Sequence, residues 1–261
     1  MSFYKPEKLP KLMVAPNGAR RIKKDHPEIP LTVSEIVETA RSCNKAGAGA
    51  MHFHVRNKNG QHVLDAGLYK ETLNELEHQL PSMHIQITTE AVGRYSSADM
   101  RKVAYDVMPP GISIGTAELI SSRKPDIEDI KLYQYLTEAG TKIQNILYQP
   151  EDIDLLINLF DKANIPINNA WCLFVIGHYS GKISYPENIQ PFIKKMEQNK
   201  INLDWAICAF GKEEISCLEK AISLGGKLRV GFENSLFMPN GEIAPDNHTK
   251  VDAISKIFKL N

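Results

Sequence analysis

The sequence predicts an α/β fold, most economically a closed (β/α)8 TIM barrel. Eight short runs rich in Val, Ile and aromatic residues follow one another along the chain, and runs of this kind are typical of buried strands. Amphipathic stretches with helical spacing lie between them, and 261 residues suit eight such units. An open doubly wound sheet is the alternative, but no GxGxxG motif follows the first run.

The expected strands are bounded by turn-forming residues. In chain order they are Lys11–Pro16, Ala50–Arg56, His84–Glu90, Gly111–Gly115, Lys142–Gln149, Ala170–Gly177, Leu203–Gly211 and Lys227–Glu233. Side chains alternate between the two faces of a strand, so every second residue of each run faces the barrel interior.

Helix boundaries are marked by capping residues. Thr32 to Glu35 form a capping-box pattern, and prolines with acidic residues at 125–128 and 150–152 are typical of a first helical turn. Gly47, Gly140 and Gly225 lie where helices end. The last helix is expected from Thr249 to Leu260. We therefore expect one barrel domain over residues 1–261, with an extended first βα loop at 17–31 on the face that carries active sites in such barrels.

Composition excludes several classes of protein. The chain is 43% hydrophobic and has 31 basic and 31 acidic residues, so it resembles neither a disordered chain nor a broadly cationic nucleic-acid binder. The apolar run Ala170–Ile176 is far shorter than the roughly 20 residues of a membrane helix, and no signal-peptide core follows Met1. We predict a soluble, cytoplasmic protein without nucleic-acid or membrane partners, and we expect its four scattered cysteines to be reduced thiols.

Two histidines in the second expected strand are candidate metal ligands. His52 and His54 are two residues apart, so their imidazoles point to the same face. Satisfied core histidines are the alternative, although two buried imidazoles on one face each need a partner. Arg56 follows on that face, either as an exposed cation at the strand end or as an anchor for an anion.

The eighth expected strand brings further polar residues to the same region. Arg229 and Glu233 share a face, and strands one and eight of a barrel are neighbours, which places the eighth near the second. Two histidines and a carboxylate leave open coordination positions and suit Zn²⁺ or Fe²⁺. A simple Arg229–Glu233 ion pair is the alternative.

Nearly the whole sequence resembles the β-keto acid cleavage enzyme family, of which 3-keto-5-aminohexanoate cleavage enzyme is the best-known type. The resemblance is carried, in order, by the motifs APNGA (15–19), PLTVSEI (30–36), AGA (46–48), HFHVR (52–56), FVIG (174–177), WAICAFG (205–211), GGKLRVGFE (225–233) and NGEIAPDN (240–247). It implies a (β/α)8 barrel, usually tetrameric, that holds Zn²⁺ through His52, His54 and Glu233.

The family reaction, as the resemblance implies it, joins a β-keto acid to acetyl-CoA and cleaves the adduct into acetoacetate and a new acyl-CoA. We therefore expect a small β-keto acid and acetyl-CoA as partners. Arg229 would stabilise negative charge in this reaction. The residues predicted to bind substrate are Asn17, Arg56, Thr88, Ser113 and Thr116.

The acid–base residues depart from the family pattern. The family follows RVGxE with an aspartate that acts as the base, whereas this chain has Asn234, which cannot accept a proton near neutral pH. Arg20 stands where the best-known type has an acidic residue, Thr88–Ala91 replaces Ser-Thr-Gly-Gly, and no acidic residue follows the fifth strand at 145–148. We predict Glu90 as the relocated base. The alternative is that Glu90 only pairs with Arg56, Arg94 or Arg20, and a metal-bound hydroxide or His178 would then be the better candidate.

Three functional hypotheses remain open. The first is an active zinc enzyme of the cleavage type, the second a metal-dependent barrel enzyme with another keto or carboxylate substrate, and the third a weakly active metal-binding protein. Two segments also have two interpretations. The basic run Arg20, Arg21, Lys23 and Lys24 either contacts a phosphate or is solvated, and His178–Lys182 either forms a lid contact or an ordinary turn.

Overall fold

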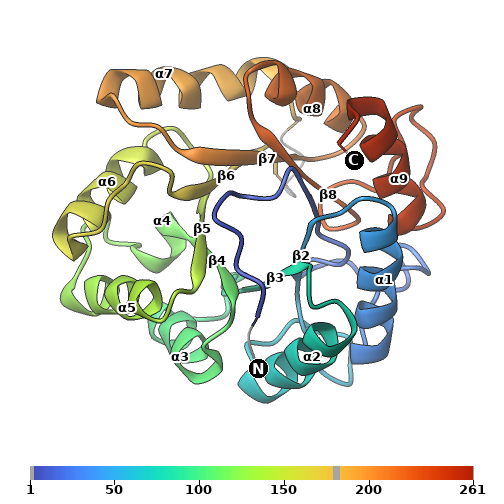
Figure 1. The fold of residues 1–261 in the computed structure, drawn as a ribbon, viewed down its shortest axis with the longest axis horizontal. Coiled ribbons are helices and arrows are strands. Elements are labelled where there is room, and N and C mark those ends of the chain that lie inside the picture. Colours follow the sequence, from blue (N-terminus) through green and yellow to red (C-terminus); the bar gives the residue numbers. More distant parts are fainter. Residues whose placement is uncertain (1–2, 179–182, 261) are drawn as a thin grey trace.

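The fold is a closed barrel of eight parallel strands surrounded by helices (Figure 1). The computed structural model describes residues 3–178 and 183–260. Each strand pairs with the next in the chain, and β1 pairs with β8 to close the barrel. The predicted fold class is therefore confirmed. The strands are β1 Leu12–Val14, β2 Ala50–Phe53, β3 His84–Thr88, β4 Gly111–Gly115, β5 Lys142–Leu147, β6 Trp171–Ile176, β7 Asp204–Ala209 and β8 Lys227–Val230.

The helices cover the outside of the barrel and bury their apolar faces against the strands. They are α1 Val33–Lys45, α2 Ala66–Gln79, α3 Ser97–Val107, α4 Thr116–Leu119, α5 Ile127–Glu138, α6 Asp152–Ala163, α7 Gln190–Asn199, α8 Glu214–Ser223 and α9 Asn247–Phe258, with a 3-10 turn at Pro186–Ile189. The last helix therefore begins at Asn247, two residues before the predicted start.

The predicted capping signals act as expected. Thr32 caps α1, and Glu35 completes the capping box. Asp126 caps α5. Gly47, Gly140 and Gly225 follow helix ends with positive φ values of 105°, 72° and 81°, a conformation in which glycine avoids the steric cost of a side chain.

Several strands end earlier than predicted, and this places site residues in loops. We expected the second strand to reach Arg56 and the eighth to reach Glu233, but β2 ends at Phe53 and β8 at Val230. Gly231 is one cause of the second difference. Its φ is 140°, and a Cβ there would lie 2.3 Å from the carbonyl oxygen of Ala15. The chain therefore turns sharply after β8, and Glu233 lies in that turn.

The N-terminal segment closes the end of the barrel opposite the predicted site. It crosses the barrel opening in the foreground of Figure 1. The backbone N–H of Leu9 donates to Asp204 at 2.8 Å, and Leu9 packs into the interior cluster with Met13 and Trp171. The barrel is thus filled at this end, which leaves the opposite end for chemistry.

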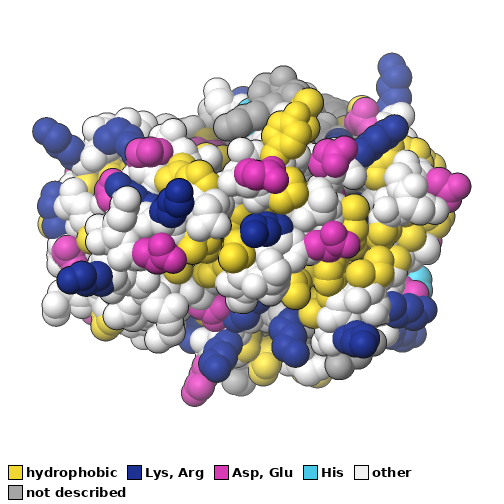
Figure 2. All heavy atoms as spheres, turned by 90° about the horizontal axis from the view of Figure 1, so that it is seen from above, with side chains coloured by type: hydrophobic (Ala, Val, Ile, Leu, Met, Phe, Trp, Pro, Cys, Tyr) yellow, Lys and Arg dark blue, Asp and Glu magenta, His cyan; other side chains and the backbone are white. Residues whose placement is uncertain are grey.

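The surface agrees with the balanced composition. Acidic and basic side chains are interspersed over the face shown in Figure 2. All four cysteines are buried and free. None of the helices in residues 3–178 and 183–260 combines the length and the apolar character that crossing a membrane requires.

Candidate active site

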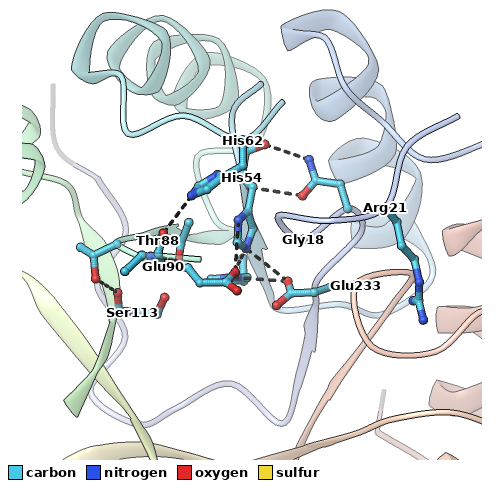
Figure 3. A network of polar contacts seen from close by, with 12 residues as sticks. Gly18, Arg21, His54, His62, Thr88, Glu90, Ser113 and Glu233 are labelled. Carbon is cyan, nitrogen blue, oxygen red and sulfur yellow. Dashed lines mark hydrogen bonds and ion pairs between the residues drawn. The ribbon is translucent and has the colours of Figure 1, made fainter. Parts of the chain in front are cut away.

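Three predicted ligands converge at the C-terminal end of the barrel. Figure 3 shows two of them, His54 and Glu233, which point toward each other. His52 lies in β2, His54 follows that strand, and Glu233 lies in the turn after β8. His52 Nε2 and His54 Nε2 are 3.1 Å apart. Glu233 Oε2 lies 3.5 Å from the first and 3.6 Å from the second. All three side chains are buried.

The spacing of these atoms fits a tetrahedral metal ion. Ligand atoms bound about 2.0–2.2 Å from a tetrahedral zinc lie roughly 3.3–3.6 Å from one another, and the three distances of 3.1, 3.5 and 3.6 Å are close to this range. The two imidazole rings meet edge to face at 80°, which directs both Nε2 atoms toward Glu233. The residues therefore fit a divalent metal held by three protein ligands.

Electrostatics favour the protonation states that metal binding needs. Burial lowers the pKa of His52 to about 4 and that of His54 well below its usual value. Burial alone would raise the pKa of Glu233, yet Arg229 and the two histidines together hold it well below the usual range. At neutral pH the cluster thus presents two neutral imidazoles and one carboxylate.

Asn17 positions one of these ligands. Its amide nitrogen donates to the carbonyl oxygens of Pro30 and His54 at 3.0 and 2.8 Å, and its amide oxygen accepts from the backbone N–H of His54 at 3.1 Å. We predicted that Asn17 binds substrate. In the structure its amide bonds to backbone groups and holds the chain on which His54 lies, and substrate binding by Asn17 stays a prediction.

For Arg56, the structure excludes one of the two alternatives, the exposed cation at a strand end. Arg56 is 6% exposed, and it donates to the carbonyl oxygens of Gly18, Arg21 and Gly60. Arg21 in turn donates to the carbonyl oxygens of Phe232 and Asn234. The two guanidinium groups thereby connect the first βα loop to the loops that carry His54 and Glu233. Substrate binding by Arg56 stays a prediction.

The predicted Arg229–Glu233 ion pair and the His–His–Glu cluster occur together. Arg229 Nη2 lies 3.0 Å from Glu233 Oε1, while the other oxygen of Glu233 faces the histidines. The same nitrogen lies 3.5 Å from Asn234 Oδ1 and 3.5 Å from Cys208 Sγ. Arg229 thus orients the carboxylate, and Asn234 stands beside it without a titratable group.

Glu90 lies at the border between the metal cluster and a cavity. Its Oε2 is 3.8 Å from His54 Nδ1. Burial, with the nearby charges of Glu233 and Glu118, raises the pKa of Glu90 to about 8. His62 holds its backbone, because His62 Nε2 donates to the Glu90 carbonyl oxygen at 3.0 Å and the His62 ring packs on His54. Sequence reasoning missed His62.

The cavity beside Glu90 has a volume of about 480 Å³. Arg20 and His178, both singled out in the sequence, line it together with Glu118 and Tyr148. Tyr148 donates to Glu118 at 2.8 Å, and the other oxygen of Glu118 accepts from the backbone N–H of Ala91 at 3.2 Å. Glu118 thus supplies an acidic group to the cavity, although it follows the fourth strand and not the fifth.

The predicted hydroxyl groups have different surroundings. Ser113 Oγ and Thr116 Oγ1 are buried and have no hydrogen-bond partner within residues 3–178 and 183–260, which leaves them able to bind a ligand. Thr88 Oγ1 instead accepts from the backbone N–H of Glu90 at 3.0 Å. Buried hydroxyls without partners are costly, but neither Ser113 nor Thr116 is among the residues that line the cavity, and substrate binding by the three hydroxyl residues stays a prediction.

The basic run is divided among separate contacts. Arg20 lines the cavity, Arg21 holds the β8 turn, Lys23 pairs with Glu35 at 2.8 Å, and Lys24 is exposed. It does not act as one patch. Of the segment His178–Lys182, residues 179–182 lie outside the described residues, so the lid interpretation is untested.

Together, the fold and the site define a (β/α)8 barrel enzyme with a His–His–Glu cluster and an adjoining polar cavity. Residues 11–260 match the model of the beta-keto acid cleavage enzyme family, and the chain belongs to this family. The resemblance noted in the sequence is thus confirmed.

Curated relatives cover almost the whole chain. A 3-keto-5-aminohexanoate cleavage enzyme of Acetoanaerobium sticklandii is 26% identical over 248 residues, which are 93% of this chain and 89% of that protein. A 3-oxoadipate:acetyl-CoA acetyltransferase of Cupriavidus necator is 22% identical over 94% of this chain and 87% of its own length. Among solved structures, ObcA in a binary complex with oxaloacetate has a TM-score of 0.71 at 14% identity, over 88% of this chain and 63% of that one. That likeness concerns the fold alone.

Proposed function

We propose that this enzyme is a zinc-dependent β-keto acid cleavage enzyme that uses acetyl-CoA. The observation that carries the proposal is the convergence of His52, His54 and Glu233 at the active end of a barrel of this family. Two relatives have acetyl-CoA in their names, and they support the choice of the second substrate. They are a 3-oxoadipate:acetyl-CoA acetyltransferase of Cupriavidus necator and a 3,5-dioxohexanoate:acetyl-CoA acetone transferase of Paraburkholderia graminis. Two imidazole nitrogens and one carboxylate oxygen are a ligand set typical of catalytic zinc sites, and this supports zinc as the metal.

The proposed reaction exchanges two acyl groups. The carbon between the keto and carboxylate groups of the β-keto acid loses a proton and bonds to the acetyl carbon of acetyl-CoA. The thioester C–S bond breaks and releases the CoA thiolate, which adds to the original keto carbon. The bond between the keto carbon and the central carbon then breaks, so the keto carbon leaves as the new acyl-CoA. The central carbon departs as an enolate and takes back a proton to give acetoacetate. When bound, zinc would supply a Lewis acid that polarises the keto group.

The protein groups have separate proposed roles. Glu90 accepts the proton, because it borders both the cluster and the cavity and Asn234 cannot titrate. Arg229 holds Glu233 and stabilises developing negative charge on the substrate. Ser113 and Thr116 donate hydrogen bonds to substrate oxygens. The cavity next to Glu90 receives the variable side chain of the β-keto acid.

Product analysis tests the proposal. The protein is incubated with acetyl-CoA and a panel of β-keto acids, and both acetoacetate and new acyl-CoA are measured by mass spectrometry. We expect equal amounts of the two products for at least one acid. His52→Ala should abolish turnover, whereas the matched control His248→Ala removes a histidine of α9 that contacts the carbonyl of Ser42 and should leave it intact.

Two outcomes would contradict the proposal. If no acid gives both products, the protein is not an acetyl-CoA-dependent cleavage enzyme, and binding of the acids without turnover would favour the hypothesis of a weakly active metal-binding protein. If the His52→Ala variant turns over at the wild-type rate, the reaction does not use the cluster. The tetrameric state and the cytoplasmic location stay predictions.

A further inference from the structure

Each metal-ligand histidine has a different group behind its ring, and both groups come from the β3 side of the site. Strands β2 and β3 pair in parallel, with His52 opposite Gln86. Gln86 Oε1 lies 3.0 Å from His52 Nδ1, and both side chains are buried. Behind His54, the nearest carboxylate is that of Glu90 at 3.8 Å, which is beyond hydrogen-bond distance. Within residues 3–178 and 183–260, His52 therefore has a direct side-chain hydrogen bond on the nitrogen that faces away from the cluster, whereas His54 Nδ1 has none.

The contact with Gln86 has a consequence for the protonation of His52. An amide oxygen only accepts hydrogen bonds, so His52 Nδ1 must carry the proton when it bonds to Gln86 Oε1. In the neutral ring the other nitrogen, Nε2, then keeps its lone pair. Nε2 is the atom that lies 3.1 Å from His54 Nε2 and 3.5 Å from Glu233 Oε2. The bond thus directs a lone pair to the centre of the cluster.

We propose that Gln86 is the positioning residue of the metal centre, whose amide oxygen holds His52 in its metal-binding tautomer and orientation. This inference rests on the proposed metal site, and it divides the roles along β3. Gln86 serves metal affinity, while Glu90, two residues after the end of β3 at Thr88 and without a direct hydrogen bond to His54, is left for the substrate. Outer hydrogen bonds to metal-binding histidines are typically worth about 10–100-fold in affinity.

Metal affinity and the spectrum of bound Co²⁺ test the proposal. Metal-free protein is titrated with Zn²⁺ against a chromophoric chelator, and the Co²⁺-loaded protein is examined by visible absorption. We expect Gln86→Leu to weaken Zn²⁺ binding about 10–100-fold and to alter the Co²⁺ bands, because the His52 ring is then free to turn. Gln86→Glu keeps an acceptor oxygen in the same place and should restore affinity to within about threefold of the wild type or better.

Two variants serve as controls. Gln144→Leu removes another buried amide of the barrel, on β5, whose nitrogen donates to the carbonyl oxygen of Cys172 at 3.5 Å, and it should leave both readouts unchanged. Glu90→Gln should also retain metal affinity, since Glu90 has no direct hydrogen bond to His54. If Gln86→Leu does not fold, Gln86→Met provides the same removal with a more flexible side chain.

The proposal is overturned if Gln86→Leu binds Zn²⁺ as tightly as Gln144→Leu does. It is also overturned if Gln86→Glu binds as weakly as Gln86→Leu, because the amide then does not act as an acceptor. Neither result depends on turnover. Absence of acetoacetate formation by the wild type would remove the proposed function but leave these affinities unaffected.

Discussion

Replacing Lys250 by methionine is expected to destabilise the protein by about 3–5 kcal/mol, the typical cost of breaking a buried ion pair. Lys250 of α9 is fully buried and donates to Glu214 of α8 and to the carbonyl oxygens of Ser235 and Phe237, at 2.9 and 2.7 Å. Burial lowers the pKa of Lys250 and raises that of Glu214. In this buried environment, the charged form of Lys250 and the charged form of Glu214 therefore stabilise each other.

The cost follows from what the substitution leaves behind. Glu214, which is 3% exposed, loses its counter-ion, and two carbonyls lose a donor at about 1 kcal/mol each. Because those carbonyls belong to the segment directly after Glu233, the change should loosen the turn that carries this ligand. Changing Glu214→Gln in the same protein removes the stranded charge, so the double variant should recover about 2–3 kcal/mol of the loss.

Urea unfolding followed by circular dichroism measures these differences on metal-free protein. The control is Lys256→Met, which removes an exposed lysine of the same helix that pairs with Asp252, and it should change stability by less than about 0.5 kcal/mol. A loss of under about 1 kcal/mol for Lys250→Met, or a double variant whose loss equals the sum of the two single losses, would refute the reasoning.

Three further predictions concern pH and the site. Burial lowers the pKa of His84 to about 4, with Lys142 nearby adding to the shift, so the unfolded chain takes up this proton first as pH falls. The folded protein therefore keeps its full stability with respect to His84 above about pH 6.5, and it loses this part of its stability as the pH falls toward 4. Between pH 7 and 4.5 the wild type should therefore lose about 2–3 kcal/mol more than His84→Leu. Equal losses in urea titrations at the two pH values would contradict this. Arg229→Lys should lower kcat by orders of magnitude, because lysine lacks the planar fork that engages Glu233 and substrate oxygens together; a variant with wild-type kcat and KM would leave Arg229 as a structural partner only. Glu90→Gln should lower kcat at least 100-fold with metal still bound, and Asn234→Asp should raise it; full activity of Glu90→Gln would exclude Glu90 as the base.

The barrel and the metal cluster were predictable because their signals are local. Strand and helix signals repeat in the order of the chain, and HxH within a strand places two imidazoles on one face whatever the rest of the chain does. The position of Glu233 beside them followed from the neighbourhood of β8, β1 and β2 in a closed barrel. Even so, every strand except β4 ends before its predicted end, because hydrophobic alternation continues past the last ladder hydrogen bond.

Contacts between separate loops were not predictable from such signals. Arg56 and Asn17 donate hydrogen bonds to backbone carbonyls. Every residue has such a carbonyl, so the sequence does not indicate which one a side chain will contact. The pairing of Glu118 with Tyr148 joins α4 to the end of β5. No spacing links these two residues, so the acidic group that Glu118 supplies to the cavity was not predicted from the sequence.

The most direct test of the account is a titration of activity with metal. Protein stripped by a chelator is given increasing amounts of Zn²⁺, and acetoacetate formed from a β-keto acid and acetyl-CoA is measured at each step. We expect no turnover without metal, a linear rise to about one Zn²⁺ per chain, and a plateau thereafter, with no recovery in the His52→Ala/His54→Ala variant. Full turnover by the stripped protein, or restoration of that double variant by Zn²⁺, would contradict this expectation.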